Sequence, residues 1–269
     1  MFKTVVPQFK SMSYGQLPRQ RLDVFMPRRA VALPVVVFFY GGAWKRGSRH
    51  QYKLLAYALM RQGYVVVVPD YRLYPAVRFP AFVDDGAAAT AWVYQNIAKF
   101  GGDPGRVYLM GHSAGAHIAS MLALDPRFLG SHGRDAQTLA GVIGLAGPYD
   151  IMPFRDAELA DTFGPEEEHE RTQPINLVTR GQAVPFLLLH GSLDKVVGPG
   201  NSKRLWKKIE ASGGRARMVF FNRLDHMTLL LALLLPGLKR FRSVRNEINQ
   251  FIAGQQPAHP SGEFVSYDY

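Results

Sequence analysis

The sequence predicts an α/β fold with a mostly parallel central sheet and helices on both faces. Short apolar runs rich in β-branched and aromatic residues alternate along the chain with stretches of helical periodicity. Because two parallel strands need a crossover connection between them, this alternation favours parallel pairing. A strand-to-helix turn of the form Gly-x-Ser-x-Gly, at Gly111–Gly115, points to the same class of fold.

The patterns predict six strands and five helices. Each expected strand is a continuous apolar run, as in a strand that is buried on both faces. The strands are expected at residues 33–40, 64–69, 106–110, 139–145, 184–189 and 216–222. The helices are expected at residues 52–61, 82–100, 116–124, 201–212 and 242–255.

The chain is long enough for one domain with a full core. It has 269 residues, an apolar fraction of 47%, and no linker-like run or internal repeat near its middle. We therefore expect a single domain over 1–269, with a lid-like insertion at about 151–181 between the fourth and fifth strands. A solvated helical excursion explains that proline-containing, partly acidic segment equally well.

Composition excludes several kinds of site and partner. The absence of cysteine rules out disulfides, thiolate metal sites and a cysteine nucleophile. The formal net charge is +11, but the basic residues are scattered and accompany no nucleic-acid-binding module, so we expect no nucleic-acid partner. No apolar run is long enough for a membrane span or a signal-peptide core, so we expect a soluble, cytoplasmic protein.

The Gly-x-Ser-x-Gly turn makes Ser113 the candidate nucleophile. A turn this sharp between a strand and a helix holds its central residue in a strained conformation that exposes the hydroxyl. The flanking glycines, Gly111 and Gly115, are needed because a side chain there would collide with the neighbouring strand or helix. The motif alone is moderately specific, but here it follows an apolar strand and precedes a helix, as it must.

A second glycine turn follows the first buried strand, in Tyr40–Trp44. An acyl-transfer enzyme needs backbone N–H groups that point at the developing oxyanion, and glycines let the chain come close enough to supply them. The candidate donors are Gly42 and Ala43, with Gly41 as an alternate, together with Ala114 after the nucleophile. An ordinary turn after a strand is the competing interpretation.

A serine nucleophile needs a base, and the base needs an orienting carboxylate. Asp194 follows the fifth expected strand and His226 follows the sixth, so the order along the chain is Ser, Asp, His. This is the order used by one class of α/β hydrolytic enzyme. Asp150, after the fourth strand, is the alternative acid, and chain order favours Asp194.

Other polar residues near the expected site have simpler roles. Asp225 is expected to cap or turn its loop, and His190 is expected to be structural. His112 and His117 flank the nucleophile, and neither follows the last strand as the base should. His112 and Trp44 are our candidate substrate-binding residues.

These motifs resemble those of the α/β-hydrolase superfamily, in particular the hormone-sensitive-lipase-like carboxylesterases and the neighbouring kynurenine formamidase branch. The likeness covers roughly residues 20 to 255, and the run GHSAGAH is more similar to the formamidase and related esterase branch. The matching residues are Tyr40–Trp44, Asp70–Leu73, Gly101–Pro104, Gly111–His117, Asp194 and His226. One departure is Tyr40, which stands where the family has the histidine that braces the oxyanion loop.

The resemblance implies an α/β-hydrolase fold and a carboxylic-ester hydrolase acting on small to medium acyl esters through an acyl-enzyme. The alternative is an arylformamidase that hydrolyses N-formylkynurenine with the same triad. No metal or organic cofactor is expected, and the expected partner is a small-molecule ester. A catalytically inactive binding protein and a basic protein that binds anionic polymers are the rivals from other classes. The oligomeric state is left open, a homodimer included.

Overall fold

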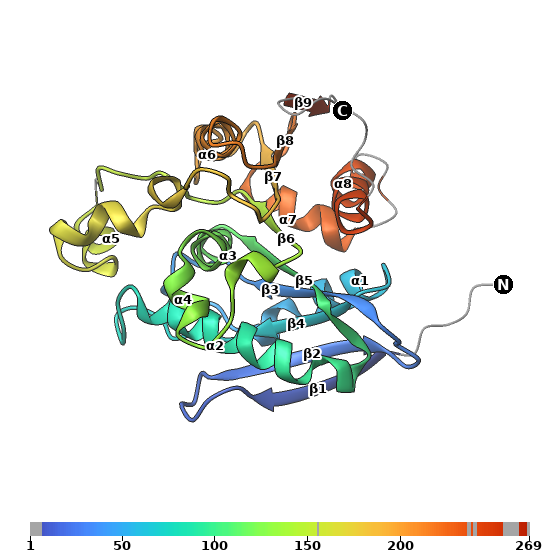
Figure 1. Ribbon diagram of the computed structural model, residues 1–269. Helices are drawn as coiled ribbons and strands as arrows, with labels where there is room; N and C mark the ends of the chain where they lie inside the picture. The colour runs from blue at the N-terminus through green and yellow to red at the C-terminus, as the bar shows by residue number, and fades with distance from the viewer. Residues whose placement is uncertain (1–6, 155, 236–237, 239–240, 255–263, 268–269) are drawn as a thin grey trace.

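A nine-stranded sheet forms the centre of the protein, in the order β1-β2-β4-β3-β5-β6-β7-β8-β9 (Figure 1). The computed structural model describes residues 7–154, 156–235, 238, 241–254 and 264–267. The strands β3 to β9 pair with one another only in parallel, and the antiparallel pairs are β1 with β2 and β2 with β4. The expected mostly parallel sheet is therefore confirmed.

All six strands expected from the sequence are present, within a few residues of the expected bounds. Three strands were not expected from the sequence: β2 and the two edge strands, β1 and β9. Strand β1 has too few apolar residues to be recognised. The strands are β1 (Pro7–Ser13), β2 (Arg21–Pro27), β3 (Leu33–Phe39), β4 (Val65–Pro69), β5 (Gly102–His112), β6 (Gly141–Leu145), β7 (Phe186–Gly191), β8 (Ala216–Phe221) and β9 (Phe264–Tyr267).

Helices cover both faces of the sheet, with α2, α3 and α6 on one side and α1, α7 and α8 on the other (Figure 1). No helix in the described part of the chain is both long and apolar enough to cross a membrane. The helices are α1 (Lys53–Met60), α2 (Ala81–Asn96), α3 (Ala114–Leu124), α4 (Pro126–Gly130), α5 (Ala157–Thr162), α6 (Gly200–Ala211), α7 (His226–Leu234) and α8 (Arg242–Ile252).

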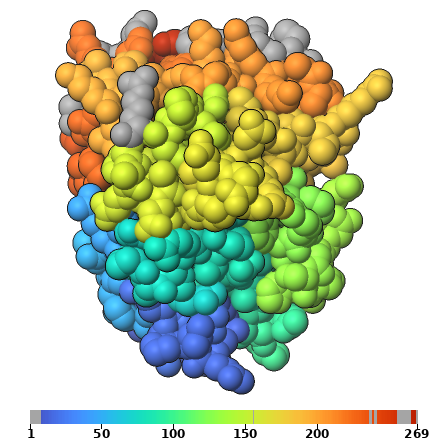
Figure 2. All heavy atoms as spheres, turned by 90° about the vertical axis from the view of Figure 1, so that its left-hand side faces the viewer, coloured from blue at the N-terminus to red at the C-terminus, as the bar shows by residue number. Residues whose placement is uncertain are grey.

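The segment 151–181 contains α5 and two short 3-10 helices, Glu166–Thr172 and Pro174–Leu177. Figure 2 shows this segment, in yellow, lying across the middle of one face of the molecule above the blue-green segment around α2. Polar and aromatic contacts join these segments. The Arg78 guanidinium forms a bidentate ion pair with Asp161, at 2.8 and 2.9 Å, and the Phe79 N–H donates to the Thr162 carbonyl at 2.9 Å. The Phe163 ring also contacts the rings of Phe79 and Phe82. The insertion is thus attached to the body of the protein by polar bonds and by ring contacts.

The turn between β5 and α3 packs so closely against the end of β3 that no side chain fits between them. A Cβ atom added to Gly111 would lie 2.2 Å from the carbonyl carbon of Gly115. A Cβ atom added to Gly115 would lie 2.0 Å from the carbonyl oxygen of Phe39, the last residue of β3. Both distances are far inside van der Waals contact with backbone, so these two positions require glycine.

This packing predicts a sharp difference between two glycine-to-alanine substitutions. Gly115→Ala should destabilise the protein by about 1–3 kcal/mol or prevent folding, because the new methyl group overlaps the β3 backbone. Gly130→Ala, at a glycine with open space around its Cα, should change stability by less than about 0.5 kcal/mol. Urea unfolding of the two variants and the wild type checks this, and equal stability of the two variants would contradict it.

Candidate active site

The three residues predicted for a catalytic triad all follow strands of the parallel part of the sheet. Ser113 follows β5, Asp194 lies in the loop after β7, and His226 lies just beyond β8 as the first residue of α7. Because β5, β6, β7 and β8 are consecutive neighbours, their carboxyl ends gather these loops at one edge of the sheet. Sites in open α/β sheets lie at this edge.

Ser113 has the strained backbone that its motif predicts. Its φ is 54° and its ψ is −124°, in a region that residues with a Cβ atom rarely adopt. The conformation is held by hydrogen bonds on both sides. The Ser113 N–H donates to the carbonyl of Leu145 at 2.9 Å, and the Ser113 carbonyl accepts from Ala116 at 2.9 Å. The turn is therefore a rigid platform for the side chain.

Asp194 and His226 form the hydrogen bond expected of an acid and a base, with 2.7 Å between His226 Nδ1 and Asp194 Oδ2. The other carboxylate oxygen accepts from the N–H groups of Val196 and Val197, each at 2.9 Å. Burial alone raises the pKa of Asp194, but the hydrogen bonds from His190, His226 and the Val197 backbone outweigh it and hold that pKa well below its usual value. The carboxylate is thus charged at neutral pH.

His112 links the base to the nucleophile turn. Its ring centroid lies 4.6 Å from that of His226, and its Nε2 lies 2.9 Å from the His226 carbonyl oxygen. Since a carbonyl only accepts, that nitrogen carries the proton. Burial, followed by the nearby His226 imidazole, lowers the pKa of His112 to about 4. A neutral ring next in sequence to Ser113 therefore packs against the base.

Within the described residues, no hydrogen bond joins the Ser113 hydroxyl to the His226 imidazole. Asp194 and His226 are hydrogen-bonded to each other, and the His226 ring contacts the ring of His112, the residue before Ser113. Serine–histidine pairs in free enzymes are often too long for a hydrogen bond and tighten only with substrate.

The glycine turn after β3 lies against the nucleophile. A Cβ atom added to Gly41 would lie 3.0 Å from the Cβ atom of Ser113 and 3.0 Å from the His112 carbonyl oxygen. The Gly41 N–H also acts on the Tyr52 hydroxyl, where it partly offsets the rise in pKa that burial causes. The loop itself is close enough to serve the serine.

Three backbone N–H groups near Ser113 remain without an acceptor among the described residues: those of Gly42, Ala43 and Ala114. Gly42 has a φ of 135° and Ala43 a φ of 52°, so both are held in left-handed conformations. These three are the first-choice donors that the sequence suggested for an oxyanion, and Gly41 is the alternate.

The two candidate substrate-binding residues are both buried. Trp44 is 3% exposed and His112 is 2% exposed. The Trp44 indole makes edge-to-face contacts with His117, at 5.1 Å between centroids, and with Phe163 of the insertion, at 4.7 Å. Trp44 therefore lies in an aromatic cluster that joins the loop after β3, helix α3 and the insertion.

The competing carboxylates are engaged in other contacts. Asp150 forms an ion pair with the Arg204 guanidinium on an exposed part of the surface. Asp225 is the N-cap of α7 and accepts from the N–H groups of Met227 and Thr228, at 3.0 and 2.8 Å, as expected. Within the described part of the chain, no hydrogen bond or ion pair joins either carboxylate to the His226 imidazole.

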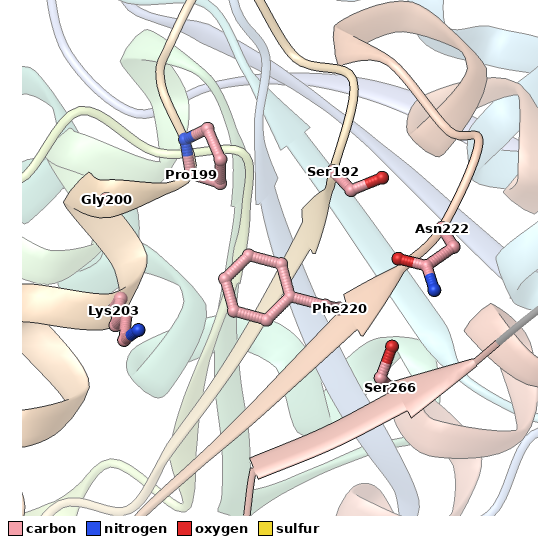
Figure 3. Close-up of a pocket in the computed structure, with 7 residues that line it drawn as sticks. All are labelled: Ser192, Pro199, Gly200, Lys203, Phe220, Asn222 and Ser266. Carbon is pink, nitrogen blue, oxygen red and sulfur yellow. The ribbon is translucent and has the colours of Figure 1, made fainter.

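A cavity of about 290 Å³ lies near the acid loop but outside this constellation. Figure 3 shows the Phe220 ring at its centre, with the hydroxyls of Ser192 and Ser266 on one side and Lys203 across from them. Its lining contains none of the three triad candidates. We therefore assign no catalytic role to this cavity.

One contributor to the site was not identified from the sequence as functional. His190, expected to be structural, has its Nε2 3.3 Å from Asp194 Oδ2 and its Nδ1 2.7 Å from the Ser202 hydroxyl. A histidine four residues before the acid, at the end of a buried strand, was the available signal. It contacts the same carboxylate oxygen as His226 does.

The nine-stranded sheet, the strained serine turn and the acid–base pair at the strand ends define an α/β-hydrolase. Residues 22–209 match the BD-FAE family, and the chain belongs to that family.

Relatives of the chain are named esterases. The isoprenylcysteine α-carbonyl methylesterase of Arabidopsis thaliana is 33% identical over 244 residues, which cover 82% of this chain and 57% of that protein. The esterase LipC of Mycobacterium tuberculosis is 34% identical over 221 residues, 74% of this chain and 54% of that protein. The chain thus spans little more than half the length of these relatives.

Solved structures share the fold. Esterase B from Lactobacillus rhamnosis has a TM-score of 0.80 at 22% identity, covering 93% of this chain and 86% of that chain. The propionate-bound esterase Est2 of Thermogutta terrifontis has a TM-score of 0.76 at 22% identity, covering 94% and 96%. These likenesses confirm the α/β-hydrolase fold.

The two buried histidines of the site should make stability depend on pH. Burial lowers the pKa of His112 and of His117 from 6.5 to about 4, so both stay neutral in the folded protein where the unfolded chain binds protons. Stability present above pH 6.5 is therefore lost as the pH falls toward 4, by about 1.4 kcal/mol per pH unit for each group.

Urea unfolding between pH 7 and pH 4.5 measures this slope. His117→Gln should remove about half of it, because one of the two groups no longer titrates. The control His132→Gln, at an exposed histidine, should leave the slope unchanged. A slope that His117→Gln does not reduce would refute the assignment to the buried rings.

Proposed function

We propose that this protein is a serine carboxylesterase with Ser113 as nucleophile, His226 as base and Asp194 as orienting acid. The observation that carries the proposal is the 2.7 Å hydrogen bond between Asp194 and His226, with the base packed against the serine turn. The esterase names of its relatives support the same activity. The engaged state of Asp150, bound to Arg204, favours Asp194 as the acid.

In this mechanism the Ser113 oxygen attacks the ester carbonyl carbon while His226 Nε2 takes the hydroxyl proton. The tetrahedral intermediate collapses, the alcohol leaves with the proton from His226, and an acyl-enzyme remains. Water then attacks the acyl carbon, passing its proton to His226, and the acid is released as Ser113 recovers its proton. Asp194 holds the imidazole tautomer with Nδ1 protonated and stabilises the imidazolium.

The oxyanion is assigned to the N–H groups of Gly42, Ala43 and Ala114. Two observations support this assignment. The loop approaches Ser113 closely at Gly41, and the three N–H groups have no other acceptor in the described part of the chain. Donors that are fixed before the reaction are worth most in a site of this kind, because they do not reorganise as charge develops.

We also propose that residues 151–181 act as a lid over a small acyl pocket within one hydrolase domain. Phe154 and Phe163 of this segment stack on each other, 5.1 Å apart, and Phe163 packs on Trp44. The aromatic surface of the lid is thus already used in its own packing. Little is left to cover a long acyl chain, in which each buried methylene is worth about 0.8 kcal/mol.

Esters are favoured over formamides as substrates, since the relatives described above are esterases. The Arabidopsis relative is named for isoprenylcysteine methyl esters, in which the acyl part is bulky and the alcohol is methanol. The Thermogutta esterase was solved with propionate, a short acyl product. The acyl series below distinguishes these two kinds of substrate for this chain.

The purified protein should hydrolyse p-nitrophenyl esters, with kcat/KM highest between acetate and hexanoate and falling for longer acyl chains. The short limit follows from a lid whose aromatic residues are packed together. Steady-state kinetics from acetate to palmitate, with N-formylkynurenine assayed beside them, measures the preference. A maximum at ten carbons or beyond would show that the lid leaves room for a long chain.

Ser113→Ala should lower this activity by at least about a thousandfold without unfolding the protein, because the nucleophile is lost. The circular dichroism spectrum provides the folding control. Residual hydrolysis above about one per cent of wild type would remove Ser113 from the mechanism.

The acid is tested by a matched pair of substitutions. Asp194→Asn should lower kcat by about 10³- to 10⁴-fold, since an amide no longer holds the required imidazole tautomer. Asp150→Asn, which loses only a surface ion pair with Arg204, should stay within about threefold of wild type. Comparable losses in the two variants would move the acid to the loop after β6.

A further inference from the structure

We propose that Tyr40 is a positioning residue for the oxyanion loop, and that its hydroxyl fixes the loop through Asp70 and Arg19. The inference rests on the proposed function, because it concerns how the same site stabilises charge. Tyr40 directly follows β3 and precedes the loop, and its hydroxyl bonds to Asp70 and Arg19.

Tyr40 is joined to a buried carboxylate directly ahead of the loop. It is fully buried and precedes Gly41, and its hydroxyl donates to Asp70 Oδ1 at 2.8 Å. Burial and the charge of Asp70 raise the pKa of Tyr40 far above its ordinary value. The phenol therefore remains a donor over the whole working pH range.

The same carboxylate also binds the far end of the loop. The Arg49 N–H donates to Asp70 Oδ1 at 2.7 Å, and the Arg49 guanidinium forms an ion pair with Asp70 Oδ2. Asp70 directly follows β4, the strand next to β3 in the sheet. Residues 41–48 are thus a strap whose two ends are held by one side chain, just beyond the neighbouring strand.

Arg19 adds a second bond across the strap. Its Nη2 donates to the Tyr40 hydroxyl and to the Gly47 carbonyl, both at 2.9 Å, while its Nε donates to the Tyr71 carbonyl at 2.7 Å. Arg19 Nη2 also lies 3.8 Å from Asp70 Oδ1. The Tyr40 hydroxyl is therefore the point at which the carboxylate, the guanidinium and the loop meet.

The Tyr40 ring is held separately from its hydroxyl. It is stacked between Tyr71, at 4.7 Å, and Tyr52, at 5.3 Å, and the Tyr71 hydroxyl donates to the Tyr40 carbonyl at 2.8 Å. A phenylalanine would keep the stacking and lose only the polar bonds. The substitution Tyr40→Phe therefore removes the anchor while leaving the packing in place.

The consequence lies in the transition state. The loop carries left-handed residues, Gly42 and Ala43, whose N–H groups must meet an oxygen that is negative only in the tetrahedral intermediate. A loop that is less firmly held offers these donors less well at that moment, while ground-state binding of the ester changes little. A loss confined to kcat is the signature that a general loss of structure would not produce.

The test compares Tyr40→Phe with Tyr64→Phe on p-nitrophenyl butyrate. Tyr64 is a matched control, because it is also a buried tyrosine whose hydroxyl donates one side-chain hydrogen bond. Its partner is Asn249, at 2.6 Å, which is not part of the proposed site. Tyr40→Phe should lower kcat by about 10- to 100-fold with KM within about threefold. Tyr64→Phe should leave both constants within about twofold. A kcat for Tyr40→Phe within twofold of wild type, or a change in KM alone, overturns the proposal.

Two further measurements keep the result interpretable. Arg19→Met, at a partly exposed residue, should lower kcat in the same direction, and Tyr40→Phe combined with Arg19→Met should lose less than the product of the two single effects. Hydrogen exchange of the 41–47 segment should be faster in Tyr40→Phe than in wild type and Tyr64→Phe. If the wild-type protein hydrolyses no ester, the proposed function is refuted. If hydrogen exchange of the loop is unchanged in Tyr40→Phe, the positioning role of Tyr40 is refuted, whether or not the protein is an esterase.

Discussion

The close approach of Gly115 to the end of β3 is the constraint on which the rest of the site depends. With no side chain between them, the first turn of α3 rests directly on the carbonyls of Phe39 and Tyr40. This contact brings the serine turn and the loop after β3 together, although they are about seventy residues apart in the sequence. The proposed nucleophile and the glycine loop then meet at one joint, and Ser113, Gly42 and Ala43 all have a positive φ.

The site is also a place where charge is buried and compensated in two separate networks. Asp194 is held by two backbone N–H groups and by the imidazoles of His190 and His226, so a carboxylate persists in an apolar setting. Asp70 is held by Tyr40 and Arg49. The first network contacts the proposed base, and the second contacts the two ends of the glycine loop after β3. A neutral His112 between base and nucleophile adds no further charge.

The aromatic cluster around Trp44 relates the site to the insertion. Phe163 reaches in from the segment 151–181 and contacts both Trp44 and His117, the residue one helical turn after Ser113. Polar bonds at the edge of the insertion, such as the pair between Arg78 and Asp161, attach it to the body of the protein. The Phe163 ring therefore fills space beside Trp44 and His117. Because protein interiors are closely packed, these rings limit the room near Ser113.

The sequence by itself determined the parallel sheet, the serine turn and the chain order of Ser113, Asp194 and His226, because these depend on local patterns. Continuous apolar runs mark buried strands, and glycines mark turns that no other residue can make. Only the tertiary structure decided which carboxylate meets His226, since Asp150 and Asp194 both follow strands and differ only in the partners that folding supplies. The contact of His190 with Asp194 and the contacts of Tyr40 with Asp70 and Arg19 were likewise hidden, because they join segments that are distant in the chain or depend on side-chain direction. Local pattern specifies strands and turns, whereas the pairing of buried polar groups exists only once the chain has packed.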